Sequence, residues 1–225
     1  VALPDHDSMD GLPEAQAEAR RCGIRFVRGI EIAVKHENDE LHLVGLWMPE
    51  LSSRMKDAIG NFRQKRSFRN MEILHSLKKI GMPLDIEEVH AFSGNGTMGR
   101  PHIASAMKSK GYVQSRRDAF SRYIGHEGRA FVPRELMSPE EGISLLRGEG
   151  ALVVLAHPCL FRHMSRQSLD GPLVKLTGYG LHAIEAYHSA HSRDQIRICV
   201  DLAAKYGLLL SGGTDYHGQN KEDIC

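Results

Sequence analysis

The chain has 225 residues, of which 41% are hydrophobic and 25% are charged, the ordinary balance of a folded globular protein. This length is enough for one α/β barrel-type domain, or for a smaller domain that carries an insertion. The formal net charge is +1 with histidine neutral, so no broad electrostatic field draws nucleic acid or an anionic membrane to the surface.

Cysteine usage and hydropathy narrow the class of protein further. The four cysteines are Cys22, Cys159, Cys199 and Cys225, and no two of them form a C-x-x-C pair. Their scatter argues against a structural zinc ribbon and against a disulfide framework. No apolar run approaches membrane-spanning length, and no signal peptide is visible. We therefore expect a cytoplasmic protein with no membrane partner.

The first fifty residues alternate strand-like and helical segments, which indicates parallel βα units. A helix is predicted over about 13–22, with Pro13 in its first turn and Gly23 just past its end. Strands are predicted at 1–3, 24–32 and 40–46. These strands carry or lead into His6, Glu31 and His42.

Residues 51–148 differ from the first fifty in pattern and composition: the pattern is mostly helical, and the segment is rich in polar residues and basic in places. Residues 52–80 have the pattern of one long helix or of two. Ser138 followed by Glu141 has the spacing of a capping box and opens another helix. The sequence is thus interpreted as a mainly helical insertion over 51–148 between the two parts of one α/β domain, 1–50 and 149–225.

Buried strands return after the insertion. Residues 151–156 form a continuous apolar run, typical of a strand that is covered on both faces, and the run ends at His157. A second strand over 181–187 is followed by His188 and His191.

The last predicted elements are a helix and a strand. The helix runs from about 192 to 206 and ends at Gly207, in the position that favours glycine after a helix. A buried strand over 208–210 then leads into Asp215 and His217. The two-residue spacing points both of these side chains to the same side of an extended chain.

Potential metal ligands recur at these strand ends: His6, Glu31, His42, His157, Asp215 and His217. In α/β barrels the carboxyl ends of the strands converge on one face, so residues distant in sequence can meet there. Imidazole with carboxylate suits Mn²⁺, Fe²⁺ or Zn²⁺, and a pair of such ions can activate water against a phosphate. Taken singly, each residue also fits a structural or solvated role, and the recurrence is what favours a metal centre.

Five motifs, taken together and in order, resemble those of the polymerase and histidinol phosphatase (PHP) superfamily of metal-dependent phosphoesterases. They are Asp5-His6-Asp7, Gly29-Ile30-Glu31, Leu41-His42-Leu43, Ala156-His157-Pro158 and Gly213-Thr214-Asp215-Tyr216-His217. The resemblance covers essentially the whole chain and is nearest to the TrpH-like branch, which includes nucleotide phosphatases and a 5′-to-3′ exoribonuclease. It implies a distorted TIM-like (β/α)7 barrel with the insertion as a cap.

The resemblance also implies roles for individual residues. Two or three divalent transition-metal ions are expected, with Glu31 as the bridging ligand. His42 and His157 would complete one site, His6 and His217 would serve a second, and Asp215 a third.

The resemblance implies that Arg100 and His102 grip the substrate phosphate from the insertion. Guanidinium matches phosphate geometry, and His102 begins an apparent helix whose N-terminus favours anions. A solvated loop cation is the alternative for Arg100. His191 is the residue that matches the family's histidine, with His188 as its local competitor. Its expected role is phosphate binding, proton donation to the leaving group, or metal contact.

One part of the family pattern is missing from the sequence. PHP enzymes open with a His-x-His motif and a following Asp on a strand that would precede Val1, and the chain contains neither. We therefore expect this chain to be an internal fragment that lacks the first strand unit.

Three functions are compatible with these features. The first is a phosphatase that acts on nucleoside monophosphates or 3′,5′-bisphosphates. The second is a 5′-to-3′ exoribonuclease that uses the same site on short RNA. The neutral charge and the 6% aromatic content favour the small substrate, because extended single-strand binding needs a basic groove with stacking platforms. The third, a PHP-like module without catalysis, is disfavoured because each motif that is present keeps its ligands.

Overall fold

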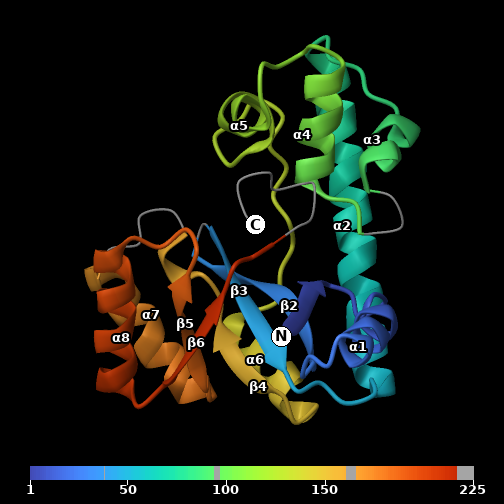
Figure 1. Cartoon of the computed structure of the whole chain (residues 1–225). Coiled ribbons are helices and arrows are strands. Elements are labelled where there is room, and N and C mark those ends of the chain that lie inside the picture. Colours follow the sequence, from blue (N-terminus) through green and yellow to red (C-terminus); the bar gives the residue numbers. More distant parts are fainter. Residues whose placement is uncertain (38, 94–96, 161–165, 217–225) are drawn as a thin grey trace. The chain divides into compact units, whose positions relative to one another are not determined.

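The computed structural model describes residues 1–37, 39–93, 97–160 and 166–216, and its chain divides into two units (Figure 1). The first unit comprises Val1–Asp57 and Leu136–Cys225, and the second comprises Ala58–Glu135. Helix α2 (Ser53–Lys79) begins in the first unit and continues into the second as one helix. Among the described residues, no helix combines the length and the apolar character that a membrane span requires.

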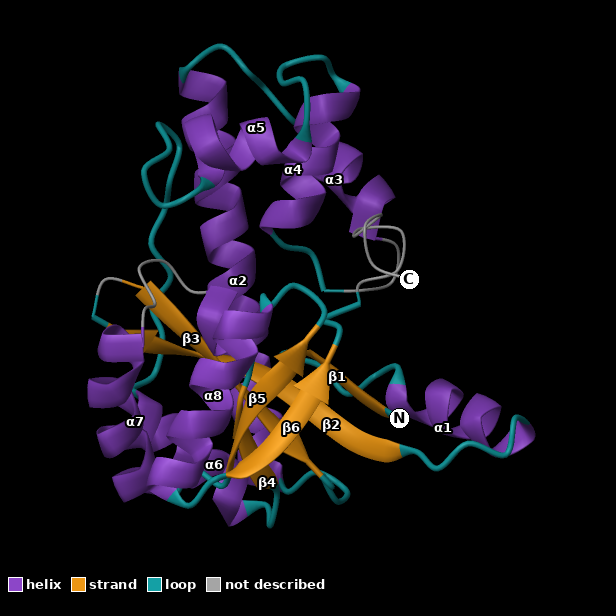
Figure 2. Cartoon of the chain, turned by 60° about the vertical axis from the view of Figure 1, so that its left-hand side comes forward, coloured by secondary structure: helices purple, strands orange, loops and turns teal. Residues whose placement is uncertain are grey.

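The first unit is built on a mixed sheet of six strands that curls like part of a barrel (Figure 2). The strands are β1 (Ala2–His6), β2 (Val27–His36), β3 (Asp39–Leu46), β4 (Leu152–Leu155), β5 (Ala183–His188) and β6 (Leu209–Gly213), and they neighbour one another in this order. This arrangement confirms the predicted α/β class, whereas the distorted TIM-like (β/α)7 barrel stays a prediction.

One strand departs from the expected parallel βα pattern. β1 and β2 pair in parallel, as do β4, β5 and β6, but β3 is antiparallel to both of its neighbours. The reason is the short connection: β2 ends at His36 and β3 begins at Asp39, and a parallel pair needs a crossover of a dozen or more residues.

The helices described in the first unit besides α2 are α1 (Leu12–Arg21), α6 (Pro139–Gly148), α7 (Arg166–Tyr179) and α8 (Arg193–Tyr206), with a 3₁₀ turn at Pro158–Leu160. Of these, α6 and α8 pack directly on the strands, and α7 packs on α6 and α8. α6 opens with the predicted capping box of Ser138 and Glu141, and it packs on β2, β3 and β4. The close approach requires Gly142, because an added Cβ would lie 2.5 Å from Val34 Cγ1.

The end of the first unit confirms one prediction and corrects another. α8 is capped by Ser192 and ends at Gly207, which has the predicted left-handed conformation. The prediction of a buried strand at 208–210 is wrong in its burial, since Leu209 and Leu210 are 58% and 46% exposed. β6 is an edge strand of the described sheet, so a neighbouring strand covers only one of its sides.

The second unit is helical and has its own core. Besides α2 it contains α3 (Ile86–Ser93), α4 (Arg100–Ser109), α5 (Arg116–Ala119) and a π-helical turn at Phe120–Ile124. Its fully buried side chains include Ile73, Leu77, Ile103, Met107 and Ile124.

Candidate metal centre

Four of the predicted metal ligands contact one another around the carboxylate of Glu31. Glu31 Oε1 lies 2.7 Å from His42 Nδ1 and 3.2 Å from His157 Nε2, and Glu31 Oε2 lies 3.6 Å from His6 Nδ1. His42 Nδ1 and His157 Nε2 are themselves 3.2 Å apart. Three histidine nitrogens thus converge on one carboxylate, which is only 4% exposed.

The strands explain how residues so far apart in sequence meet. The register of the parallel β1–β2 pair sets His6 beside Glu31. β3 runs next to β2 and carries His42, and His157 follows directly after β4, the next strand. Asp215 follows β6 and joins Glu31 and His157 in a second group of potential ligands.

The donor atoms form two overlapping groups that fit a pair of metal ions. In the group of His6, Glu31 and His42, one ligand atom from each residue lies within 4.8 Å of the others, and the same holds for Glu31, His157 and Asp215. Glu31 belongs to both groups, as a bridging carboxylate would. Imidazole and carboxylate are donors that Mn²⁺, Fe²⁺ and Zn²⁺ accept, so the residues present fit the metals that the sequence predicts.

Electrostatics favours an ionised Glu31. Burial raises the pKa of Glu31, but the attraction of His6 and His42 and the hydrogen bonds from His157 and His42 outweigh burial and hold this pKa well below its usual value. Burial lowers the pKa of His42, but the attraction and hydrogen bond of Glu31 prevail and raise it. A carboxylate that stays ionised while buried is suited to bind cations.

Glu185 is a further member of the centre that the sequence did not predict. Its carboxylate oxygen Oε2 accepts a hydrogen bond of 2.6 Å from the backbone N–H of His157. Burial raises the pKa of Glu185, and the negative charges of Glu31 and Asp215 add to this effect. An added Cβ at Gly213 would overlap Glu185 Oε1, so glycine is needed there. The available signal was an acidic residue in the middle of an otherwise apolar strand.

His188 and His191 extend the row of imidazole rings away from the centre. The His157 and His188 ring centroids are 5.9 Å apart, and those of His188 and His191 are 5.1 Å apart. His188 Nδ1 accepts a hydrogen bond from the N–H of Ala190, and His191 Nδ1 lies 3.1 Å from the carbonyl oxygen of Ala186. Both histidines are buried, at 4% and 8% exposure.

The described structure does not test three of the predicted site residues. His217 is outside the described residues. Arg100 and His102 belong to the second unit, at the start of α4. The guanidinium of Arg100 lies 5.9 Å from the ring centroid of Phe120, and His102 Nδ1 accepts a hydrogen bond from the N–H of Gly99 and so caps the helix. Their contact with phosphate stays a prediction.

Comparison with known proteins places the chain among phosphoesterases. No protein-family model matches the chain. It is 28% identical to a 5′-3′ exoribonuclease of Haemophilus influenzae, over 96% of this chain and 78% of that protein. It is also 28% identical to a 3′,5′-nucleoside bisphosphate phosphatase of Chromobacterium violaceum, over 100% of this chain and 79% of that protein. A phosphoribosyl 1,2-cyclic phosphate 1,2-diphosphodiesterase of Eggerthella lenta is 26% identical, over 97% and 83%.

Solved structures agree with these relatives. A Bifidobacterium adolescentis structure assigned as a metal-dependent phosphoesterase superimposes with a TM-score of 0.86 at 29% identity, covering 99% of this chain and 78% of that one. An amidohydrolase from C. violaceum, solved with bound sulfate and no metal, gives a TM-score of 0.92 at 28% identity with the same coverage. The prediction of a phosphoesterase-like hydrolase is confirmed at this level.

Proposed function

We propose that this chain belongs to the PHP superfamily, in its TrpH-like branch, and that it hydrolyses phosphate monoesters of nucleotides with the help of bound metal ions. The observation that carries the proposal is the convergence of His6, His42 and His157 on the buried carboxylate of Glu31. A structural histidine cluster has no need for a buried anion shared by three imidazoles. A pair of bound cations needs this arrangement, because a bridging carboxylate offsets part of their charge.

Divalent cations held here would supply Lewis acidity, both to activate a water molecule and to offset the charge of the phosphate. The role of the protein residues is to hold the metal ions and to orient the ligands around them. Glu31 would be shared by both donor groups, which His6, His42, His157 and Asp215 would complete. We include His217 as a further ligand because it follows Asp215 in the predicted motif.

Glu185 fixes the position of His157 through the backbone rather than through the imidazole ring. Its carboxylate accepts the His157 N–H, and this bond orients the residue whose side chain binds the metal. Because Glu185 is half-buried near the charges of Glu31 and Asp215, its raised pKa also limits the number of negative charges in the centre.

Arg100 and His102 are proposed to bind the substrate phosphate. A guanidinium offers paired donors that match phosphate oxygens, and the N-terminus of α4 carries the partial positive charge of the helix dipole, which favours anions. For His191, the burial of the side chain argues against direct contact with substrate.

We propose a nucleoside 3′,5′-bisphosphate or monophosphate as the substrate, as in the C. violaceum phosphatase. The alternative is RNA processed from its 5′ end, as in the exoribonuclease of H. influenzae. The net charge of +1 supports the small substrate, since the long contact with RNA relies on basic residues.

The test is a direct comparison of the two substrates on intact protein loaded with Mn²⁺. Phosphate release from a nucleoside 3′,5′-bisphosphate and nucleotide release from a 5′-phosphorylated oligoribonucleotide are measured as kcat/KM, with Glu31→Gln as the inactive control. We expect the bisphosphate to be preferred. A higher kcat/KM on RNA would establish the alternative, and equal rates for Glu31→Gln and wild type would reject the metal centre.

A further inference from the structure

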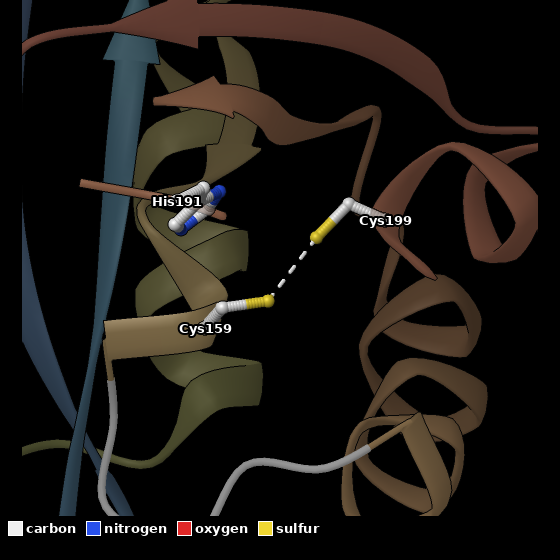
Figure 3. Close-up of side chains that lie close together, drawn as sticks. All are labelled: Cys159, His191 and Cys199. Carbon is white, nitrogen blue, oxygen red and sulfur yellow. Dashed lines mark hydrogen bonds between the residues drawn. The ribbon is translucent and has the colours of Figure 1, made fainter. Parts of the chain in front are cut away.

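A second group of metal-binding side chains lies outside the phosphoesterase centre (Figure 3). Cys159 belongs to the 3₁₀ turn that follows His157, His191 precedes α8, and Cys199 lies within α8. All three are buried, at 8%, 8% and 0% exposure. This group could not be predicted from the sequence, because the two cysteines are separated by 40 positions and form no recognised motif.

The spacing of the donor atoms suits a shared cation. The sulfur atoms of Cys159 and Cys199 are 3.5 Å apart and point toward each other, with the His191 ring beside them (Figure 3). One nitrogen of His191 and both sulfurs all lie within 4.8 Å of one another. Two thiolates at about 2.3 Å from one tetrahedral Zn²⁺ are about 3.8 Å apart, close to the observed separation. A disulfide would need the sulfurs at about 2.05 Å, a larger displacement.

His191 has a donor atom to offer. Its Nδ1 faces the carbonyl oxygen of Ala186, which only accepts hydrogen bonds, so Nδ1 carries the ring proton and Nε2 keeps a lone pair. Among the residues that the structure describes, none forms a hydrogen bond with Nε2, although this atom is buried. A hydrogen bond from Nδ1 to a backbone carbonyl is the usual way in which a metal-binding histidine is oriented.

We propose that Cys159, Cys199 and His191 form a structural site for one thiophilic cation of the Zn²⁺ or Cu⁺ type. Two thiolates and an imidazole are the donors that these ions prefer over Mn²⁺ or Mg²⁺. The three donors can fill a trigonal Cu⁺ site or three of the four positions of a tetrahedral Zn²⁺ site. The bound ion would tie the turn that follows His157 to α8.

The test uses the full chain, stripped of metal under reducing conditions and titrated with Co²⁺ as a spectroscopic substitute for Zn²⁺. Thiolate bound to Co²⁺ gives a near-ultraviolet charge-transfer band. The phosphoesterase centre gives none, because its proposed ligands are imidazole and carboxylate. All proteins carry Cys225→Ser, and Cys22→Ser is the matched control because Cys22 is an exposed free thiol. We expect the band in this background and in Cys22→Ser, and its loss in Cys159→Ser and Cys199→Ser.

A second measurement does not depend on the folding of the variants. X-ray absorption at the zinc edge of the Zn²⁺-loaded protein should show sulfur neighbours at about 2.3 Å. The proposal is overturned if the reduced protein shows neither sulfur neighbours nor a charge-transfer band, or if Cys159→Ser keeps the band at full intensity. It is also overturned if thiol counting before reduction shows that Cys159 and Cys199 form a disulfide, and Zn²⁺ does not bind the two thiols once that disulfide is reduced.

Discussion

Replacement of Glu185 tests whether the metal centre depends on a residue that touches no substrate. Glu185→Ala removes the acceptor of the 2.6 Å hydrogen bond from the His157 N–H and leaves that buried donor unpaired. An unpaired buried donor costs about 1–3 kcal/mol. If the lost free energy destabilises the position that His157 holds in the metal-loaded enzyme, kcat should drop by about 5- to 150-fold, because each 1.36 kcal/mol corresponds to a factor of ten in rate.

The assay compares kcat and the Mn²⁺ dissociation constant for Glu185→Ala, Glu185→Gln and a matched control. Glu141→Ala is that control, since Glu141 accepts a 2.7 Å bond from the Ser138 N–H in an exposed capping box. Its loss should lower the melting temperature and leave kcat unchanged. Glu185→Gln keeps an acceptor oxygen and should lie between wild type and Glu185→Ala. Unchanged kcat and Mn²⁺ affinity in Glu185→Ala would refute the positioning role.

Three further predictions follow from the site and the fold. Exhaustive chelation should abolish phosphoesterase activity and Mn²⁺ should restore it, because a bound metal is needed to activate water near neutral pH; activity that survives chelation, verified by elemental analysis, would contradict this. Arg100→Ala should raise KM and spare kcat, since a clamp that binds ground state and transition state equally contributes only to binding, with Arg122→Ala as the control. Gly142→Ala should lower the melting temperature, because the new Cβ would lie 2.5 Å from Val34 Cγ1 and overpacking costs about 1–3 kcal/mol. Gly60→Ala, where an added Cβ meets open space in the described structure, should raise it instead.

Some parts of this molecule could be predicted because they follow from local patterns. Helix ends have characteristic capping residues, so Ser138 correctly predicted the start of α6 and Gly207 correctly predicted the end of α8. The convergence of His6 with Glu31 followed from the parallel pairing of adjacent strands. The antiparallel direction of β3 was not predicted, because the sequence pattern shows strands and does not show which way they run.

Other parts depend on contacts between distant segments. The hydrophobic character of Leu209 and Leu210 does not reveal that β6 is an edge strand, which depends on the order of strands in the sheet. Glu185 has the sequence context of an ordinary strand residue, and only the turn at His157 gives its carboxylate a partner. Cys159 and Cys199 meet because the 3₁₀ turn and α8 are neighbours in space.

The backbone at the strand ends explains why the centre could be located from the sequence and its geometry could not. Asp7, His157 and Asp215 have φ values of 51°, 28° and 51°, a region that side chains other than glycine rarely adopt. Each such residue costs about 1–3 kcal/mol and persists only where its surroundings hold it. Asp7 is held by the bond from its N–H to the Glu31 carbonyl, and His157 by Glu185. These turns have no periodicity, so patterns of hydrophobicity cannot predict them. These turns also orient the ligands. Loss of the hydrogen bonds that hold the turns should therefore lower the metal affinity as well as the stability of the fold.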